Sequence, residues 1–356
     1  MHNTTYTIFF DGIISRYDYY VIATFLPVSW TLLSLCGIVC NVINIITFVA
    51  MGLNDGVTVS FLALTIFDLT YVNASFCIGI ASCFSLTERI STVLFPVEPY
   101  GVVVLLANIM IMLAVTNVLT TTFLAVARCM CVAKPLHFKN YFTVKRTVYF
   151  MSGFAIFAVT VYTPLLANMA MVTMLDARIN MSRPTLWMSK YREPIKNVVF
   201  VITDMILPVS SQFIVLTCII IMASSLRASS RFRQKTKIQT SDQKKLQITS
   251  ELQDKGTANA NITDKLSGKE LRVVTQVTLI SVVYVACNTP RILIIAAALF
   301  EPEFKLGRQF HYFYISLNGF RKHLEIINAS VNTLIYFNYN SKFRAIMLKR
   351  IKSTQS

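Results

Sequence analysis

Seven long apolar segments constrain this sequence more than any other feature. They cover residues 22–50, 57–84, 99–131, 146–171, 197–226, 271–300 and 310–338. A helix needs about 20 mostly apolar residues to cross a bilayer, and every segment is longer than that. Because backbone polar groups cannot stay unpaired in lipid, each segment is predicted to be a transmembrane helix. The predicted fold class is therefore an all-α membrane protein, a bundle of seven helices.

The composition agrees with lipid as the surrounding solvent. Of the 356 residues, 54% are hydrophobic and 14% are charged, whereas soluble domains carry about 25% charged residues. The formal net charge is +16. In a membrane protein such an excess collects in cytoplasmic loops, so we predict membrane lipids as partners and no binding of nucleic acid.

The distribution of basic residues predicts the orientation of the bundle. Residues 227–268 contain nine Lys or Arg against four Asp or Glu. Residues 132–145 contain three lysines, and the tail after the last apolar segment contains five basic residues and no acid. The positive-inside rule makes these three regions cytoplasmic and places the N-terminus outside the cell.

Three regions are predicted on this basis. Residues 1–21 form an extracellular N-terminus, residues 22–338 form the seven-helix domain, and residues 339–356 form a cytoplasmic tail. Within the domain, residues 227–268 are poor in apolar side chains, which predicts a largely disordered cytoplasmic loop whose ends extend the neighbouring helices.

The tail and the outer face carry two smaller signals. In the tail, Phe343 and Ile346 fall on one helical face among basic residues, which predicts a short amphipathic helix on the inner leaflet. Glycosylation sequons begin at Asn3 and Asn180, both on the predicted outside. We therefore expect a surface helix at the C-terminus and a glycosylated outer face.

Polar side chains inside the apolar segments indicate where function lies. A charge within a membrane is costly unless it faces the bundle interior and finds partners. The second segment contains Asp68, and the third contains Asn117 and Arg128 on one helical face. In the seventh segment polar side chains recur every three or four residues, at Asn318, Arg321, Glu325, Asn328, Asn332 and Tyr336. Single polar residues often only join two helices, but the whole set favours a functional site.

At these positions the chain resembles the rhodopsin-like (class A) G-protein-coupled receptors. The resemblance covers about residues 37–351. It rests on "GIVCN" ending at Asn41, "LALTIFD" ending at Asp68, "ARC" around Arg128, "CNTP" ending at Pro290 and "NTLIY" ending at Tyr336. Each motif is weak alone, but together they follow the family's order on the corresponding helices.

The chain also departs from the family pattern. Ala127 stands for the family's Asp, Cys129 for Tyr, Asn288 for Trp and Thr333 for Pro, and residues 172–196 contain no Cys. The disulfide that usually ties the second outer loop to helix three is therefore predicted to be absent. These departures are typical of a divergent branch, most similar to invertebrate chemosensory or orphan neuropeptide-type receptors.

The resemblance implies a receptor that activates a heterotrimeric G protein when helix six moves outward. It implies a switch built from Arg128, Glu270, Pro290, Asn332 and Tyr336. Because Ala127 removes the adjacent carboxylate, we predict that Arg128 and Glu270 pair in the resting state. The alternative is a solvated Glu270 with Arg128 reaching to the membrane interface.

The resemblance also implies a sodium ion, although no cofactor is expected to be required. Asp68, Asn117, Asn328 and Asn332 bear the oxygen atoms that a hard cation prefers. The alternative is a protonated Asp68 that is hydrogen-bonded to the asparagines.

The outer cavity is predicted to bind an extracellular ligand. By spacing, Met110, Asp204, Arg291, Lys322 and Glu325 are expected to line it. Met110 stands where aminergic receptors place an Asp, which argues against a biogenic amine, and the mixed charges suit a peptide or amino-acid-like ligand. The alternative is a salt bridge within the helix, from Glu325 to Arg321 or Lys322.

The sequence thus favours a multi-pass receptor of the plasma membrane. A transporter or channel is the alternative, because Asp68 and the polar residues of the seventh segment could line an ion path; inverted repeats and broken helices, which transporters often show, are not visible in the sequence. An enzyme is not expected, since the sequence contains no Gly-x-Ser-x-Gly or His-Glu-x-x-His motif.

Overall fold

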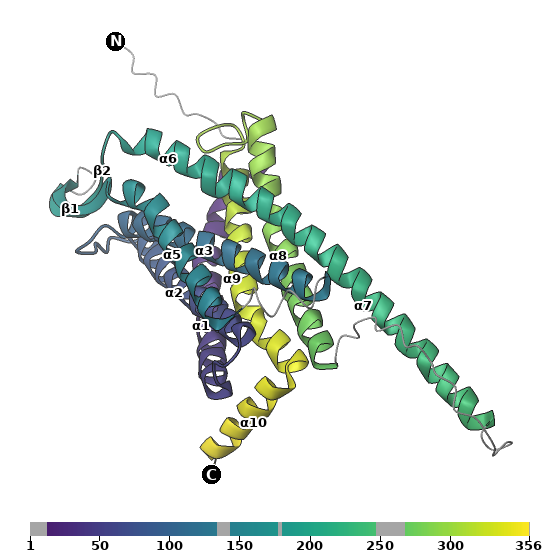
Figure 1. The fold of residues 1–356 in the computed structure, drawn as a ribbon. Helices are drawn as coiled ribbons and strands as arrows, with labels where there is room; N and C mark the ends of the chain where they lie inside the picture. The colour runs from purple at the N-terminus through teal and green to yellow at the C-terminus, as the bar shows by residue number, and fades with distance from the viewer. Residues whose placement is uncertain (1–12, 134–142, 177–179, 247–267, 356) are drawn as a thin grey trace.

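The computed structural model describes residues 13–133, 143–176, 180–246 and 268–355. Its helices lie side by side in one elongated bundle (Figure 1). In chain order they are α1 (Arg16–Met51), α2 (Gly56–Ile90), α3 (Pro99–Ala133), α5 (Val144–Leu166), α6 (Arg192–Phe200), α7 (Leu207–Leu246), α8 (Gly268–Phe300), α9 (His311–Tyr339) and α10 (Ser341–Gln355). The strands β1 (Met169–Asp176) and β2 (Met181–Met188) precede α6, and the π-helix η1 (Val201–Ile206) joins α6 to α7.

The predicted seven-helix bundle is confirmed. Six helical stretches of the described chain are long and apolar enough to cross a membrane, with α6, η1 and the first part of α7 forming one of them. The seventh, α9, is more polar because it carries Arg321, Lys322 and Glu325. It packs against α1, α2 and α8, and these three charged side chains are half-buried.

The fifth spanning helix contains a wide turn that the sequence prediction missed. The backbone N–H of Leu207 bonds the carbonyl of Ile202, five residues earlier, which is the π-helical pattern. Pro208 has no N–H to give to the carbonyl of Asp204, so the regular α-helical bond is lost at this point. The wide turn therefore directly precedes Pro208.

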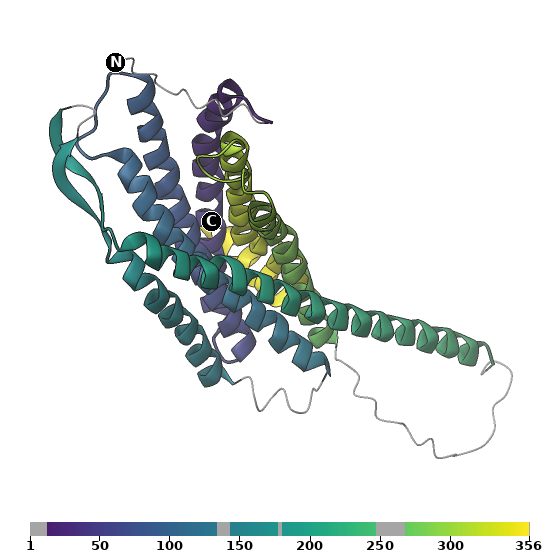
Figure 2. The same ribbon diagram turned by 90° about the horizontal axis from the view of Figure 1, so that it is seen from above.

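The ends of the long cytoplasmic segment extend the neighbouring helices, as predicted. Of residues 227–268, α7 takes up those to Leu246, a longer extension than a largely disordered loop implies. Arg, Lys and Gln are good helix formers, and a helix already nucleated in the membrane extends at little cost. The green ribbon of α7 runs well beyond the other helices in Figure 2. Residues 247–267 lie outside the described residues.

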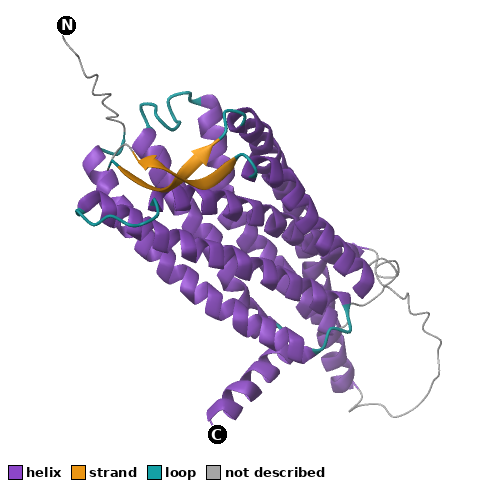
Figure 3. Cartoon of the chain, turned by 90° about the vertical axis from the view of Figure 1, so that its left-hand side faces the viewer, coloured by secondary structure: helices purple, strands orange, loops and turns teal. Residues whose placement is uncertain are grey.

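The outer end of the bundle carries a β-hairpin where a longer fourth helix was predicted. Helix α5 ends at Leu166 rather than near residue 171, and β1 pairs antiparallel with β2 from Met169↔Met188 to Asp176↔Met181. Figure 3 shows the two strands lying across one end of the bundle, while α10 leaves from the opposite end. Helix α1 also begins at Arg16, within the region expected to be a non-helical N-terminus.

The inner end of the bundle is packed around aromatic rings. Phe48, Phe61, Tyr336 and Phe343 are each 0–1% exposed, and the Phe48 ring lies 4.9 Å from Tyr336 and 5.1 Å from Phe343. The predicted tail helix forms as α10, but Phe343 packs against this cluster, while Lys342 Nζ donates to the Met51 carbonyl at 2.8 Å. The tail helix is thus attached to α1, α2 and α9 through the protein itself.

Candidate functional site

A buried ion pair joins the fifth and sixth spanning helices. Asp204 lies in η1 and accepts a hydrogen bond from the Arg291 guanidinium of α8. Arg291 also donates to the Thr203 carbonyl at 3.3 Å. Because η1 widens the helix at this point, it places both a carboxylate and a free carbonyl toward α8. Two residues that were predicted to line the outer cavity are therefore in direct contact.

A second ion pair lies on α9. Arg321 Nη1 donates to Glu325 Oε1 at 2.6 Å, and the Tyr71 hydroxyl of α2 donates to Glu325 Oε2 at 2.7 Å. The alternative of an internal Arg321–Glu325 salt bridge is the arrangement that the structure contains. Sequence reasoning missed Tyr71, although its position one turn after Asp68 placed it on the same face of α2.

The remaining predicted ligand residues separate. Met110 is 3% exposed and lies in an apolar core with Tyr71 and Ile326, so it does not face the cavity as predicted. Lys322 points to the other side of α9, where its Nζ lies 5.0 Å from the centre of the Trp30 ring. No ion pair of the described residues includes Lys322.

The two ion pairs border a cavity of about 420 Å³ between α3, the α6–η1 segment, α8 and α9. Asp204, Arg291, Lys305, Asn318 and Arg321 give it its polar lining. The Nε atoms of Arg291 and Arg321 are buried without a hydrogen-bond partner. The guanidinium groups of Arg291 and Arg321 both line the cavity, so it offers cationic groups to which an acceptor group on a ligand can bind.

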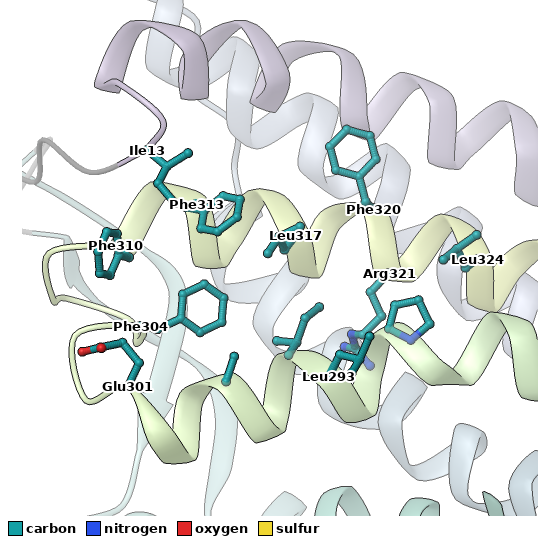
Figure 4. Close-up of a pocket in the computed structure, with 13 residues that line it drawn as sticks. Ile13, Leu293, Glu301, Phe304, Phe310, Phe313, Leu317, Phe320, Arg321 and Leu324 are labelled. Carbon is teal, nitrogen blue, oxygen red and sulfur yellow. The ribbon is translucent and has the colours of Figure 1, made fainter.

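A larger apolar cavity of about 620 Å³ lies between α8 and α9 (Figure 4). Phe304, Phe313 and Leu317 line it, and Arg321 extends from α9 toward α8 beside Leu293. Leu293 and Phe320 are 61% and 55% exposed. Since spanning helices expose apolar side chains mainly to lipid, this cavity opens sideways toward the membrane.

The middle of the bundle contains the predicted carboxylate–asparagine cluster. Asp68 is 1% exposed and accepts hydrogen bonds from Asn117 Nδ2 at 3.1 Å and from Asn332 Nδ2 at 2.9 Å. Asn328 lines a neighbouring cavity of about 40 Å³. The Asn117 Oδ1 atom is buried without a partner. Asp68 itself does not line this cavity, and each of its oxygens accepts a hydrogen bond from an asparagine. The sodium ion and the protonated Asp68 therefore both stay predictions.

The inner switch residues are only partly described. Arg128 is 4% exposed and is therefore buried in the bundle rather than at the lipid interface. The Asp55 carboxylate at the start of α2 acts on it electrostatically. The side chain of Glu270 lies outside the described residues, so the Arg128–Glu270 pair stays a prediction. Asp55 is a carboxylate near Arg128 that sequence reasoning missed, because a different helix supplies it.

Asn288 of α8 stands where the class A family has a tryptophan, and it makes polar contacts. Asn288 Nδ2 donates to Gln212 Oε1 at 3.2 Å, and Gln212 Nε2 donates to Thr289 Oγ1 at 3.0 Å. One turn earlier, the buried Tyr284 hydroxyl lies 2.7 Å from Ser211 Oγ. Hydrogen bonds between α7 and α8 thus stand where the class A family has a tryptophan.

The outer hairpin is held by charges. None of the eight cysteines, all of which lie in the described residues, forms a disulfide. Instead, Arg183 of β2 contacts Glu88 of α2, donates to Asp176 of β1 at 2.8 Å and donates to the Phe95 carbonyl at 3.0 Å. Burial alone would lower the pKa of Arg183, but the hydrogen bonds to Glu88 and Asp176 outweigh it and raise the pKa, so the guanidinium stays charged.

The predicted glycosylation sites differ in what the structure says of them. Asn180 is exposed in the turn of the hairpin with a positive φ of 51°, a conformation that Asn tolerates better than most residues. Asn3 lies outside the described residues. Glycosylation of both residues stays a prediction.

Comparison with known proteins places the chain in a family. A search of curated proteins finds no match. A family model described as "Serpentine type 7TM GPCR chemoreceptor Srx" matches residues 32–253, which is more than half of the chain. This match confirms the resemblance to G-protein-coupled receptors and its chemosensory branch. The chain therefore belongs to the Srx family of serpentine chemoreceptors, which are multi-pass receptors of the plasma membrane.

Proposed function

We propose that the chain binds an extracellular peptide or amino-acid-like ligand in the 420 Å³ cavity and activates a heterotrimeric G protein. The observation that carries this proposal is the Asp204–Arg291 pair at the wall of the cavity. A ligand ammonium group would compete for Asp204, and a ligand carboxylate would compete for the guanidinium groups of Arg291 and Arg321, which line the cavity.

The pair couples the cavity to the helix that must move. Arg291 directly follows Pro290, where the ring interrupts the hydrogen bonding of α8. Breaking the Asp204–Arg291 pair would release α8 from η1 next to Pro290, where α8 lacks a regular hydrogen bond. A ligand that favours the broken pair shifts the population toward an arrangement with α8 displaced outward.

The inner half is suited to such a movement. Residues Ala125, Cys218, Met222 and Val274, from α3, α7 and α8, form a core of small and flexible side chains. Outward movement of α8 would separate this core and expose Arg128 to the G protein. In the same proposal, a sodium ion beside Asp68 would hold the resting arrangement together, with Asn117 and Asn332 orienting the carboxylate.

The test is nucleotide exchange on a G protein in membranes that contain the receptor. We expect Arg291→Gln and Asp204→Asn each to raise basal exchange severalfold, because both remove the contact that holds α8. Lys196→Met, on the exposed part of α6, is the control and is expected to leave exchange unchanged. Unchanged basal exchange in both cavity variants would refute the proposed lock. Ion flux in the same cells without exchange would indicate a channel instead.

A further inference from the structure

A further cavity, of about 260 Å³, lies between α1, α2, α3 and α9 and meets the 420 Å³ cavity at Asn318. Among its described lining residues only Arg89 and Lys322 are charged, and both are cationic. Neither takes part in an ion pair of the described residues. The carboxylate nearest to Lys322 along α9, Glu325, is already bound by Arg321 and Tyr71.

Aromatic rings stand beside both cations. Arg89 lies 5.5 Å from the centre of the Tyr100 ring at the outer end, and Lys322 Nζ lies 5.0 Å from the centre of the Trp30 ring further in. Trp30 is fixed in place, because its Nε1 donates to His323 Nδ1 at 2.9 Å. Along α1, Trp30 lies about 16 Å deeper than the lining residue Tyr19. The cavity thus has a cationic rim and a cationic inner end, joined by aromatic walls.

Lys322, at the inner end of the cavity, indicates the charge of the ligand. A charged amine inside a spanning bundle is costly without a counter-charge, and a ring face compensates only part of that cost. The volume is below the range of about 300–1,000 Å³ that is usual for drug-sized ligands. A small anion with a flat apolar body matches the charge, the walls and the size.

We propose that this cavity is a second ligand site, which binds a small organic acid. Its carboxylate contacts Lys322, its apolar body lies between Trp30 and Tyr100, and Arg89 attracts the anion at the rim. Asn318 lines both this cavity and that of the proposed function, but Lys322 and Arg89 line only this one. The occupancy of the site is measurable without a G protein.

Phenylacetate is the probe, with phenylacetamide and 2-phenylethylamine as its neutral and cationic counterparts. The chain has two tryptophans, and Trp187 lies on the outer hairpin, so full-length receptor carrying Trp187→Phe reports on Trp30 alone. We expect phenylacetate to change Trp30 fluorescence saturably in purified receptor in lipid nanodiscs. The amide and the amine are expected to bind at least about tenfold more weakly, because they lack the charge-assisted bond.

Variants separate this site from the other cavities. Lys322→Met is expected to weaken phenylacetate binding about tenfold, and Arg89→Gln, on the exposed rim, is the second variant should Lys322→Met fold poorly. The matched control is Lys190→Met, since Lys190 is exposed and its Nζ lies 5.1 Å from the Tyr191 ring outside the cavity; unchanged binding is expected.

Three results would overturn the site. They are no saturable Trp30 response at millimolar phenylacetate, equal affinity for acid and amide, or full affinity in both Lys322→Met and Arg89→Gln. Loss of binding in Lys305→Met alone would place the acid in the larger polar cavity and would equally overturn it. Because none of these measurements involves a G protein, they leave the proposed signalling function to its own test.

Discussion

The outer and inner halves of the bundle bury side chains of different kinds. The outer half buries ion pairs, Asp204–Arg291 and Arg321–Glu325, next to cavities. The inner half packs the rings of Phe48, Phe61, Tyr336 and Phe343 against one another. Ion pairs are directional and a ligand group can replace either partner, whereas packed rings hold helices together without offering a binding group. In the proposed function, the outer half receives the ligand and the inner half holds the helices together.

The inner half is itself divided. The large rings join α1, α2, α9 and α10, while the core between α3, α7 and α8 is built of smaller side chains, apart from Tyr284. Small side chains interlock less than packed rings do, and Met222 among them adapts to rearrangement. This division supports α8 as the moving helix and the α1–α2–α9 group as the static part.

The largest effect is expected at the ion-pair cluster of the outer hairpin. Arg183→Met removes the buried guanidinium that both Glu88 and Asp176 contact, and we expect a loss of about 3–5 kcal/mol in the free energy of unfolding. Thermal unfolding of purified receptor would measure it. Lys196→Met removes a solvent-exposed pair and is the control, with an expected change below about 0.5 kcal/mol.

A combined variant sharpens this expectation. In Arg183→Met with Glu88→Gln and Asp176→Asn the stranded charges are gone, so much of the lost stability should return. Equal stability of native protein and Arg183→Met would show that the hairpin is not held by this cluster.

A slightly smaller effect is expected in the inner aromatic cluster. Phe48→Ala leaves a cavity among three rings, and we expect a loss of about 3 kcal/mol, at the lower end for such substitutions because lipid weakens the transfer contribution. Thermal unfolding is again the measurement, and Phe213→Ala on the exposed face of α7 is the matched control. If both variants lost the same stability, packing would not distinguish the inner half.

The smallest effect is expected between α7 and α8. Ser211→Ala leaves the buried Tyr284 hydroxyl without its partner and is expected to cost about 1–2 kcal/mol. Adding Tyr284→Phe removes the unmatched hydroxyl and should restore part of the loss. A double-mutant cycle from thermal unfolding gives the coupling between the two residues, and a coupling near zero would mean that this bond does not join the helices.

Sequence reasoning predicted the spans and most of the mid-membrane cluster correctly. Apolar length is a local property, so all seven helices could be read directly, and the three- to four-residue spacing on α9 placed Asn332 on the face that meets Asp68. It missed the β-hairpin because Met169–Asp176 is as apolar as the end of a helix. It predicted that α7 would extend beyond the membrane but not how far, since a charged, polar composition does not by itself prevent a helix.

The sequence by itself determined that this chain spans a membrane seven times, which end faces the cytoplasm, and which polar residues lie within the spans. Only the tertiary structure decided their partners. The packing of helices that are far apart in the chain decides that Arg291 contacts Asp204. It also decides that Lys322 lines a cavity instead of pairing with a carboxylate side chain. Sequence periodicity shows which residues share a face of one helix. The electrostatic interactions of a charged side chain, however, depend on the groups within a few ångströms of it on the neighbouring helix.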